Sequence, residues 1–443
     1  MRVPAFSALL THEGREILRE ADPETVARDP LAAASRLRAD PRVAALAPDI
    51  PVSELVNAVM TQVSLRGRGR AKFGENAARM FFTPNGLEQS TRRTVAAYRA
   101  ERTARHLPDA VARGAFAGDL CCGIGADLLA LAARGVPVEG VDADPLTVAV
   151  ARANIEALGL AEYARVREGD VNAVAPGDHP LLFCDPARRG GRGRVFDPSA
   201  YSPPWDVATR LAEGAEAACL KAAPGIPHEV LSPAASAEWI SVDGELKETA
   251  LWFGGLGFDQ APGPGAGKGS GGGPGPSAGH GAPRRRATVL HEREGLLASE
   301  GASAHLDEVP GLGPAPVAPA RRYLYDPDPA VVRSHLVAEA AARVDGALLD
   351  ERIAYFTSDR AERSPLWRVL EVLEFAPFSL KRLRSSVRAH KAGTVTIKKR
   401  GSAVDTEKLR RDLRASGPES VTVALTRIGE KPFYLLCRET EAA

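Results

Sequence analysis

The chain has 443 residues, which suits two or three domains, and it is 44% hydrophobic and 26% charged, as is typical of a globular protein. Its formal net charge of +1 excludes a uniformly basic protein, so any basic surface must be local. No apolar run approaches the roughly 18–20 residues of a membrane span, and the N-terminus lacks the pattern of a signal peptide. The five cysteines lack the spacing of a metal site or a disulfide framework. We therefore expect a cytoplasmic protein with no membrane contact and no bound metal.

Residues 1–100 are predicted to be helical. Three stretches carry apolar residues at helical spacing and are separated by Pro and Asp, at Leu31–Leu37, Val43–Leu46 and Val52–Val63. The next stretch, Ser64–Lys72, alternates Gly with Arg, and we expect a loosened basic segment there. Another helix is expected over Glu88–Arg105.

From Phe116 onward, short apolar strands alternate with helices, which predicts a Rossmann-like α/β fold whose parallel sheet is covered by helices on both faces. Helices are expected over Ala126–Arg134 and Pro145–Leu158, the second capped by Asp144. A further strand is expected over Trp239–Phe253, and Ala287–Leu290 is its predicted partner. The first five strands are predicted at Phe116–Cys121, Pro137–Val141, Arg165–Arg167, Leu181–Cys184 and Ala217–Lys221.

A Gly- and Pro-rich segment at 257–286 lacks the apolar residues of a core, so we predict a disordered loop joining two late strands of one sheet. Alternatively, the basic end of this segment, Arg284–Arg286, contacts nucleic acid.

The predicted organisation is a helical N-terminal region at 1–100, a Rossmann-like domain at 101–320 and a small basic α+β domain at 321–443. In the last domain a helix is expected over Asp328–Arg343, with Pro329 in its first turn. Further elements are expected at Leu366–Phe375, Thr394–Lys398, Thr406–Ala415 and Val421–Leu425.

A cofactor site is predicted where the first strand meets its helix. Gly123 and Gly125 stand at that turn, where backbone N–H groups approach a ligand closely. Asp119, Asp142 and Asp170 end three consecutive strands, and these ends meet in one crevice. Asp142 is placed to accept both ribose hydroxyls of an adenosine cofactor, and Asp170 to bind the adenine amino group. The predicted pocket also includes the neighbours Cys121, Ala143 and Val171.

A nicotinamide dinucleotide is the direct alternative, but its fingerprint requires Gly where this chain has Leu128. The segments Asp119-Leu-Cys-Cys-Gly-Ile-Gly-Ala-Asp, Gly140-Val-Asp-Ala-Asp and Asp185-Pro-Ala-Arg resemble successive motifs of class I S-adenosylmethionine (SAM)-dependent methyltransferases. The whole chain also resembles the bacterial group of these enzymes with a C-terminal THUMP-like domain, through Phe82-Thr-Pro-Asn-Gly-Leu-Glu-Gln and Tyr323-Leu-Tyr-Asp-Pro-Asp-Pro-Ala. The resemblance implies SAM as cofactor and RNA as substrate.

Asp185 and Pro186 are the predicted reacting centre. In the amino-methylating members of the superfamily, an acid and the next backbone carbonyl at this position hold a planar amine toward the methyl group. Ala187 and Arg188 depart from the Pro-aromatic pair that follows in those enzymes, so a stacking ring must come from elsewhere. The segment also resembles that of uracil C5-methyltransferases, which need a cysteine nucleophile on a later loop. No cysteine stands in a matching context, so we favour direct in-line transfer.

Substrate contacts are predicted from basic residues and from the resemblance. Between Lys381 and Arg400 there are eight Lys or Arg and no acid, a pattern that favours phosphate contacts, although a solvated helix face is the alternative. RNA, as tRNA or rRNA, is the predicted substrate; a non-catalytic SAM-binding RNA-binding protein, or a methyltransferase of proteins or small molecules, are the alternatives. The candidate substrate-binding residues are Phe82, Arg188, Arg189, Lys381, Arg382, Arg384, Lys398, Lys399 and Arg400.

Overall fold

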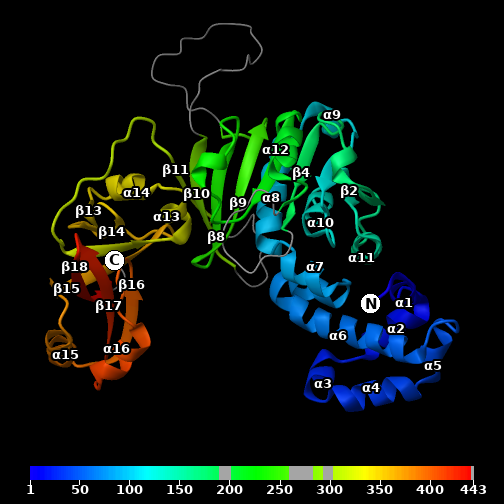
Figure 1. Cartoon of the computed structure of the whole chain (residues 1–443), viewed down its shortest axis with the longest axis horizontal. Coiled ribbons are helices and arrows are strands. Elements are labelled where there is room, and N and C mark those ends of the chain that lie inside the picture. Colours follow the sequence, from blue (N-terminus) through cyan, green and yellow to red (C-terminus); the bar gives the residue numbers. More distant parts are fainter. Residues whose placement is uncertain (189–200, 259–282, 293–302, 441–443) are drawn as a thin grey trace, which may run out of the picture. The chain divides into compact units, whose positions relative to one another are not determined.

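The computed structural model describes residues 1–188, 201–258, 283–292 and 303–440. The chain divides into two compact units (Figure 1). The first comprises Met1–Ser236, Thr249–Pro283 and Glu292–Gly301, and the second comprises Ala237–Glu248, Arg284–His291 and Ala302–Ala443. Most of the predicted Gly/Pro loop, at 259–282, and the candidate residue Arg189 lie outside the described residues.

The N-terminal region is helical, as predicted. Several of its short helices begin with an Asp or Thr whose side chain accepts a backbone N–H, followed by Pro at the first helical position. The helices are α1 (Val3–Ala8), α2 (His12–Glu20), α3 (Pro23–Arg28), α4 (Pro30–Ala39), α5 (Pro41–Ala45), α6 (Val52–Phe73), α7 (Pro84–Gln89) and α8 (Arg93–Arg105).

The prediction of a loosened segment at Ser64–Lys72 is wrong, because α6 continues without a break to Phe73. Its two glycines allow close packing. A Cβ at Gly67 would lie 3.1 Å from Pro23, and one at Gly69 would lie 3.0 Å from the ring of Phe82. The helix predicted from Glu88 begins later, at Arg93, because the short helix α7 precedes it.

The central sheet has nine strands in the order β11-β10-β8-β9-β7-β4-β1-β2-β3. The strands from β7 to β3 are parallel, and α10 (Ala126–Ala132), α11 (Pro145–Leu158) and α12 (Trp205–Glu213) stand between them in the sequence. The short helix α9 (Asp109–Ala112) precedes the sheet. The strands are β1 (Ala117–Leu120), β2 (Val138–Asp142), β3 (Ala164–Glu168), β4 (Leu181–Cys184), β7 (Ala217–Ala222), β8 (Ser236–Val242), β9 (Glu245–Gly254), β10 (Arg284–Leu290) and β11 (Ala304–Asp307), with a separate pair β5 (Ala187–Arg188) and β6 (Tyr201–Ser202).

The single strand predicted over Trp239–Phe253 is in fact the hairpin β8–β9, and β9 runs antiparallel to β7. Asp243 and Gly244 form its two-residue turn with φ of +49° and +79°, the conformation that Asp-Gly turns favour. The prediction that the Gly/Pro segment joins two strands of one sheet is confirmed, since β9 and β10 belong to the same sheet.

The C-terminal unit contains a seven-stranded sheet in the order β13-β14-β12-β15-β18-β17-β16. The single helix predicted over Asp328–Arg343 is two helices, because the chain turns at His335 with φ of +59°. The helices are α13 (Pro329–Arg333), α14 (Val337–Arg343), α15 (Leu380–Ala389) and α16 (Thr406–Leu413), and the strands are β12 (Tyr323–Pro327), β13 (Ala347–Asp350), β14 (Ile353–Ser358), β15 (Trp367–Pro377), β16 (Ala392–Lys399), β17 (Glu419–Ile428) and β18 (Lys431–Glu439).

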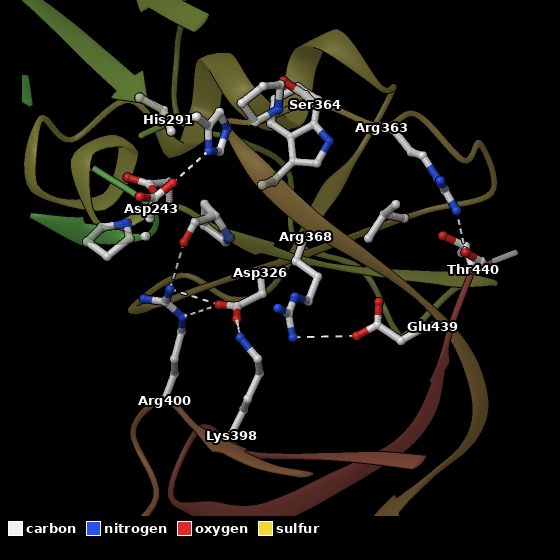
Figure 2. Close-up of a pocket in the computed structure, with 18 residues that line it drawn as sticks. Asp243, His291, Asp326, Arg363, Ser364, Arg368, Lys398, Arg400, Glu439 and Thr440 are labelled. Atoms are coloured by element: carbon white, nitrogen blue, oxygen red, sulfur yellow. Dashed lines mark hydrogen bonds and ion pairs between the residues drawn. The ribbon is translucent and has the colours of Figure 1, made fainter. Parts of the chain in front are cut away.

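An open cavity of about 750 Å³ lies in this unit (Figure 2). Acids and bases line it together. Asp326 forms an ion pair with Lys398 at 2.5 Å and accepts hydrogen bonds from Arg400 at 2.8 and 3.0 Å. Arg368 forms an ion pair with Glu439 at 3.5 Å. Most of its charged side chains therefore already have partners of opposite sign.

Candidate active site

The turn between β1 and α10 exposes backbone rather than side chains. Cys121, Gly123 and Gly125 all have positive φ, at +61°, +57° and +91°, and Gly125 caps α10. A Cβ added at Gly123 would meet no atom within 4 Å, so the turn faces open space there. Such a turn at a helix N-terminus presents N–H groups to a ligand.

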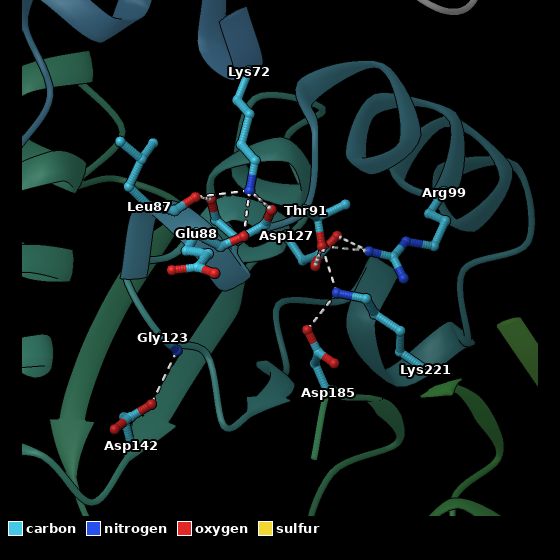
Figure 3. A network of polar contacts seen from close by, with 11 residues as sticks. Lys72, Leu87, Glu88, Thr91, Arg99, Gly123, Asp127, Asp142, Asp185 and Lys221 are labelled. Atoms are coloured by element: carbon cyan, nitrogen blue, oxygen red, sulfur yellow. Dashed lines mark hydrogen bonds and ion pairs between the residues drawn. The ribbon is translucent and has the colours of Figure 1, made fainter. Parts of the chain in front are cut away.

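The predicted acids stand around this turn, at the carboxyl ends of neighbouring strands. Asp142 accepts hydrogen bonds from the N–H groups of Gly123 and Asp144, both at 3.0 Å (Figure 3). Asp170, which follows β3, is exposed and caps the short 3₁₀ helix Val171–Ala173. Ala143 is exposed beside Asp142, and Val171 is buried. The residues predicted to bind the cofactor therefore lie on three adjacent strand ends.

Two buried amides fasten the N-terminal region beside this turn. Asn154, which is fully buried on α11, accepts the N–H of Phe81 at 2.7 Å and donates to the carbonyls of Phe81 and Ile124 at 3.1 and 3.0 Å. Gln62 on α6 pairs in the same way with both backbone groups of Phe82, at 3.0 and 2.6 Å. The Ile124 carbonyl belongs to the glycine turn, so Asn154 links the turn directly to the N-terminal region.

Helix α7 is also held against this turn. A Cβ at Gly86 would come within 2.4 Å of Ile124, which shows how closely the two segments approach. Lys72 donates to the carbonyls of Leu87, Glu88 and Ser90 at the end of α7, at 2.7, 2.6 and 3.0 Å (Figure 3). The structure places the candidate substrate residue Phe82 in the core, fully buried against Phe73 at 5.5 Å between ring centroids.

Asp185 follows β4 and is part of a polar network that the sequence did not reveal. Its carboxylate forms an ion pair with Lys221 on β7, and Lys221 donates to the hydroxyl of Thr91 at 2.9 Å (Figure 3). Thr91 in turn donates to Asp127 at 2.8 Å, and the buried Arg99 pairs with Asp127 at 2.5 Å. Pro186 is buried next to Asp185.

The acids of this region differ in protonation tendency. Burial, reinforced by the charges of Asp127 and Asp185, raises the pKa of Asp119 well above its ordinary value. Burial also acts to raise the pKa of Asp127, but Arg99 and Lys221 outweigh it, so that pKa lies below the ordinary value. Asp119 is 3% exposed, and its Oδ2 has no hydrogen-bond partner among the described residues.

Two cysteines near the turn, Cys122 and Cys184, are poor nucleophiles. Burial raises the pKa of Cys122 well above the ordinary thiol value, and a hydrogen bond with Cys121 together with burial raises the pKa of Cys184. All five cysteines are free thiols, and Cys219 and Cys437 are buried in strands. The carboxylates and Lys221 are therefore the leading candidates for the chemistry of the site.

The candidate substrate residues of the C-terminal unit lie on α15 and at the end of β16. Arg382 pairs with Glu374 at 2.8 Å, and Arg384 donates to the Asp412 carbonyl at 2.5 Å. Lys398 and Arg400 share Asp326, whereas Lys381 and Lys399 are exposed. Of the two remaining candidates, Arg188 lies in β5, and Arg189 lies outside the described residues.

Comparison with known proteins identifies the family. A family model described as THUMP domain-like matches residues 367–439. The chain is 34% identical over 373 residues to a protein of Mycobacterium tuberculosis named an uncharacterized S-adenosylmethionine-dependent methyltransferase, covering 82% of this chain and 91% of that relative. This chain belongs to the SAM-dependent methyltransferases.

The enzyme shares its fold with a protein of Porphyromonas gingivalis W83 whose crystal structure is assigned as that of a methyltransferase, at 20% identity and a TM-score of 0.69 over the full length of both chains. Its cofactor is SAM. Within the described ranges, no helix is long and apolar enough to cross a membrane, and no cluster of His, Cys, Asp and Glu is arranged to hold a metal ion.

Proposed function

We propose that this enzyme transfers the methyl group of SAM to RNA, and that the strand-end acids around the glycine turn bind the cofactor. The charge balance of the site supports this. Among the described residues, three carboxyls, of Asp119, Asp127 and Asp185, meet two cations, Arg99 and Lys221. When Asp119 is ionised, these carboxyls outnumber these cations by one among the described residues, and SAM, with its ammonium, sulfonium and carboxylate, brings one net positive charge.

The unpartnered oxygen of Asp119 is the observation that carries this proposal. A buried carboxyl oxygen without a partner is unfavourable unless a ligand supplies one. We assign Asp119 to the ammonium of SAM, the N–H groups of the glycine turn to its carboxylate, Asp142 to its ribose and Asp170 to its adenine. When bound, SAM supplies an electrophilic methyl group on its sulfonium.

At the reacting centre, Asp185 and the backbone carbonyl of Pro186 accept hydrogen bonds from the acceptor amine and hold its lone pair toward the methyl group. The elevated pKa values of Cys122 and Cys184 argue against a covalent thiolate intermediate, so these residues support direct transfer. The carboxylate also stabilises the positive charge that develops on the attacking nitrogen.

RNA as the acceptor is supported by the THUMP domain-like match and by the exposed cations of α15 and β16. Lys381 and Lys399 are exposed, so a phosphate backbone is able to reach them, although Lys399 also donates to the Val404 carbonyl at 3.3 Å. Arg188 and Arg189, next to the reacting centre in sequence, are assigned to a substrate phosphate.

The test is transfer of labelled methyl from SAM by the wild type and by Asp185→Ala into RNA, DNA and protein from cells that lack this protein. We expect label in RNA with the wild type and a loss of at least ~100-fold with Asp185→Ala, while SAM affinity stays within about threefold. Label confined to protein or DNA would refute the RNA substrate. Equal losses of turnover and SAM affinity would instead place Asp185 in the cofactor pocket.

A further inference from the structure

Lys221 is a buried cation at the reacting centre that no sequence motif indicates. It lies on β7, directly across from Asp185, because Leu220 pairs with Cys184 in the parallel register of β4 and β7. Its side chain is 14% exposed, whereas that of Asp185 is 38% exposed. A lysine ammonium is costly to bury without compensation, and here the Asp185 carboxylate and the Thr91 hydroxyl provide it (Figure 3).

The position of the Lys221 ammonium is fixed by a chain of hydrogen bonds behind it. The Thr91 hydroxyl donates its proton to Asp127 at 2.8 Å and accepts from both Lys221 and Arg99, at 2.9 and 3.1 Å. That hydroxyl therefore has its donor and both acceptor positions in use and cannot rotate freely. Arg99 is 1% exposed and anchors the chain in the packing of α8 against α10.

This arrangement separates two tasks. The pair of Arg99 with Asp127 already joins α8 to α10, so that contact does not depend on Lys221. Lys221 instead points from this anchored chain toward the more exposed Asp185, which lies close enough to Asp119 to raise its pKa. Lys221 is the cation that the described residues place against the Asp185 carboxylate, close to the carboxyls of Asp119 and Asp127.

We propose that Lys221 is a positioning residue for methyl transfer, which binds one oxygen of Asp185 and leaves the other directed at the N–H of the acceptor. This inference rests on the proposed role of Asp185. In the transfer, the lone pair of the acceptor nitrogen forms the new N–C bond while the electron pair of the C–S bond goes to sulfur. The nitrogen then loses a proton through Asp185 to solvent. A carboxylate held in one orientation favours both events.

The test compares Lys221→Met, Lys221→Arg and a matched control, Arg134→Met. Arg134 lies just beyond α10, far along the helix from the glycine turn, and pairs with Glu101 at 2.6 Å, with side-chain exposures of 26% and 22%. Each variant is measured for SAM affinity, thermal unfolding, and kcat and KM with the fraction that the wild type labels. A double variant, Lys221→Met with Asp185→Ala, completes a cycle with the single changes.

We expect Lys221→Met to lower kcat by ~100-fold, the scale of removing one preorganised charged group, with SAM affinity and KM changed less than about threefold. Lys221→Arg should recover at least about a tenth of the lost rate, and the double variant should be no slower than Asp185→Ala alone. Losses that multiply in the double variant, or a kcat change below about threefold, would overturn the inference, as would an equal loss in Arg134→Met.

A failure of the RNA proposal can be told apart from a failure of the inference about Lys221. If the wild type labels protein instead, the RNA substrate is wrong, and the same kinetic comparison still decides the role of Lys221. If no fraction is labelled, crystal structures of the wild type and Lys221→Met decide it. One fixed rotamer of Asp185 in the wild type that is lost in Lys221→Met supports the inference, and an unchanged Asp185 in both refutes it.

Discussion

Asp119→Asn is expected to weaken SAM binding and to stabilise the cofactor-free enzyme. Asp119 is 3% exposed, its Oδ2 has no partner among the described residues, and burial and nearby carboxylates raise its pKa. Asparagine keeps the shape of the side chain but never carries the negative charge that we assign to the SAM ammonium.

The expected magnitudes follow from these contacts. A hydrogen bond to a charged group contributes about 1.5–3 kcal/mol, so losing it should weaken SAM binding by ~10- to ~150-fold. Removing the charge of this buried carboxyl should stabilise the free enzyme by about 1–3 kcal/mol at pH values where Asp119 is ionised. In a domain of this size, each kcal/mol raises Tm by about 2–4 °C.

The sign of the pH dependence is also fixed. Because the folded enzyme holds the Asp119 proton more tightly than an unfolded chain, this carboxyl favours folding below its ordinary pKa of about 3.9. That contribution is lost as pH rises through the raised pKa of the folded state. The Tm advantage of Asp119→Asn over the wild type should therefore grow with pH until that raised pKa is passed.

Calorimetric titration with SAM and thermal unfolding across pH provide the assay. Asp109→Asn is the matched control, since Asp109 is 91% exposed and contacts Arg113 at 3.8 Å. It should change neither property. Unchanged SAM affinity in Asp119→Asn would refute the assignment to the ammonium, and a lower Tm at neutral pH would refute the argument from the unpartnered oxygen.

Three further changes test other parts of the enzyme. Asp142→Ala should weaken SAM binding by roughly 1–3 kcal/mol, and unchanged affinity in titration would exclude it as the ribose acceptor. Asn154→Leu leaves buried backbone groups of Phe81 and Ile124 without partners and should lower unfolding free energy by at least about 2 kcal/mol in urea; a smaller loss would mean that the N-terminal helices are not fastened there. Lys381→Ala should reduce the salt dependence of RNA binding by about one unit of slope, and an unchanged slope would remove Lys381 from the RNA contact.

The conformation of the glycine turn was predictable from sequence because its signal is local. A strand, two glycines and a helix follow one another within a few residues, and acids at successive strand ends must converge in a parallel sheet. The structure brings Asp119, Asp142 and Asp170 to neighbouring strand ends. The hairpin at Asp243 and Gly244 had a local signal too, an Asp-Gly pair between two apolar stretches.

The network around Asp185 has no such local signal. Thr91, Asp127 and Lys221 come from separate parts of the chain, and only the packing of α8 on α10 and of β7 beside β4 brings them together. Lys221 alone carried a hint, because a charged residue at the carboxyl end of a parallel strand faces the crevice where ligands bind. Side-chain pairing across such distances depends on register, and a single sequence does not contain it.

The basic run from Lys381 to Arg400 shows the same limit for charge. Counting residues along the chain gives eight cations and no acid, but the acids that neutralise some of them come from elsewhere. Asp326, some seventy residues earlier in the chain, forms ion pairs with both Lys398 and Arg400, and Glu374 pairs with Arg382. Asp326 is only 11% exposed, so it holds Lys398 and Arg400 inside the protein, where a phosphate would have to compete with it for them. The surface that we propose for RNA is consequently smaller than the eight cations suggest, and it centres on the exposed side chains of α15, Lys381 among them.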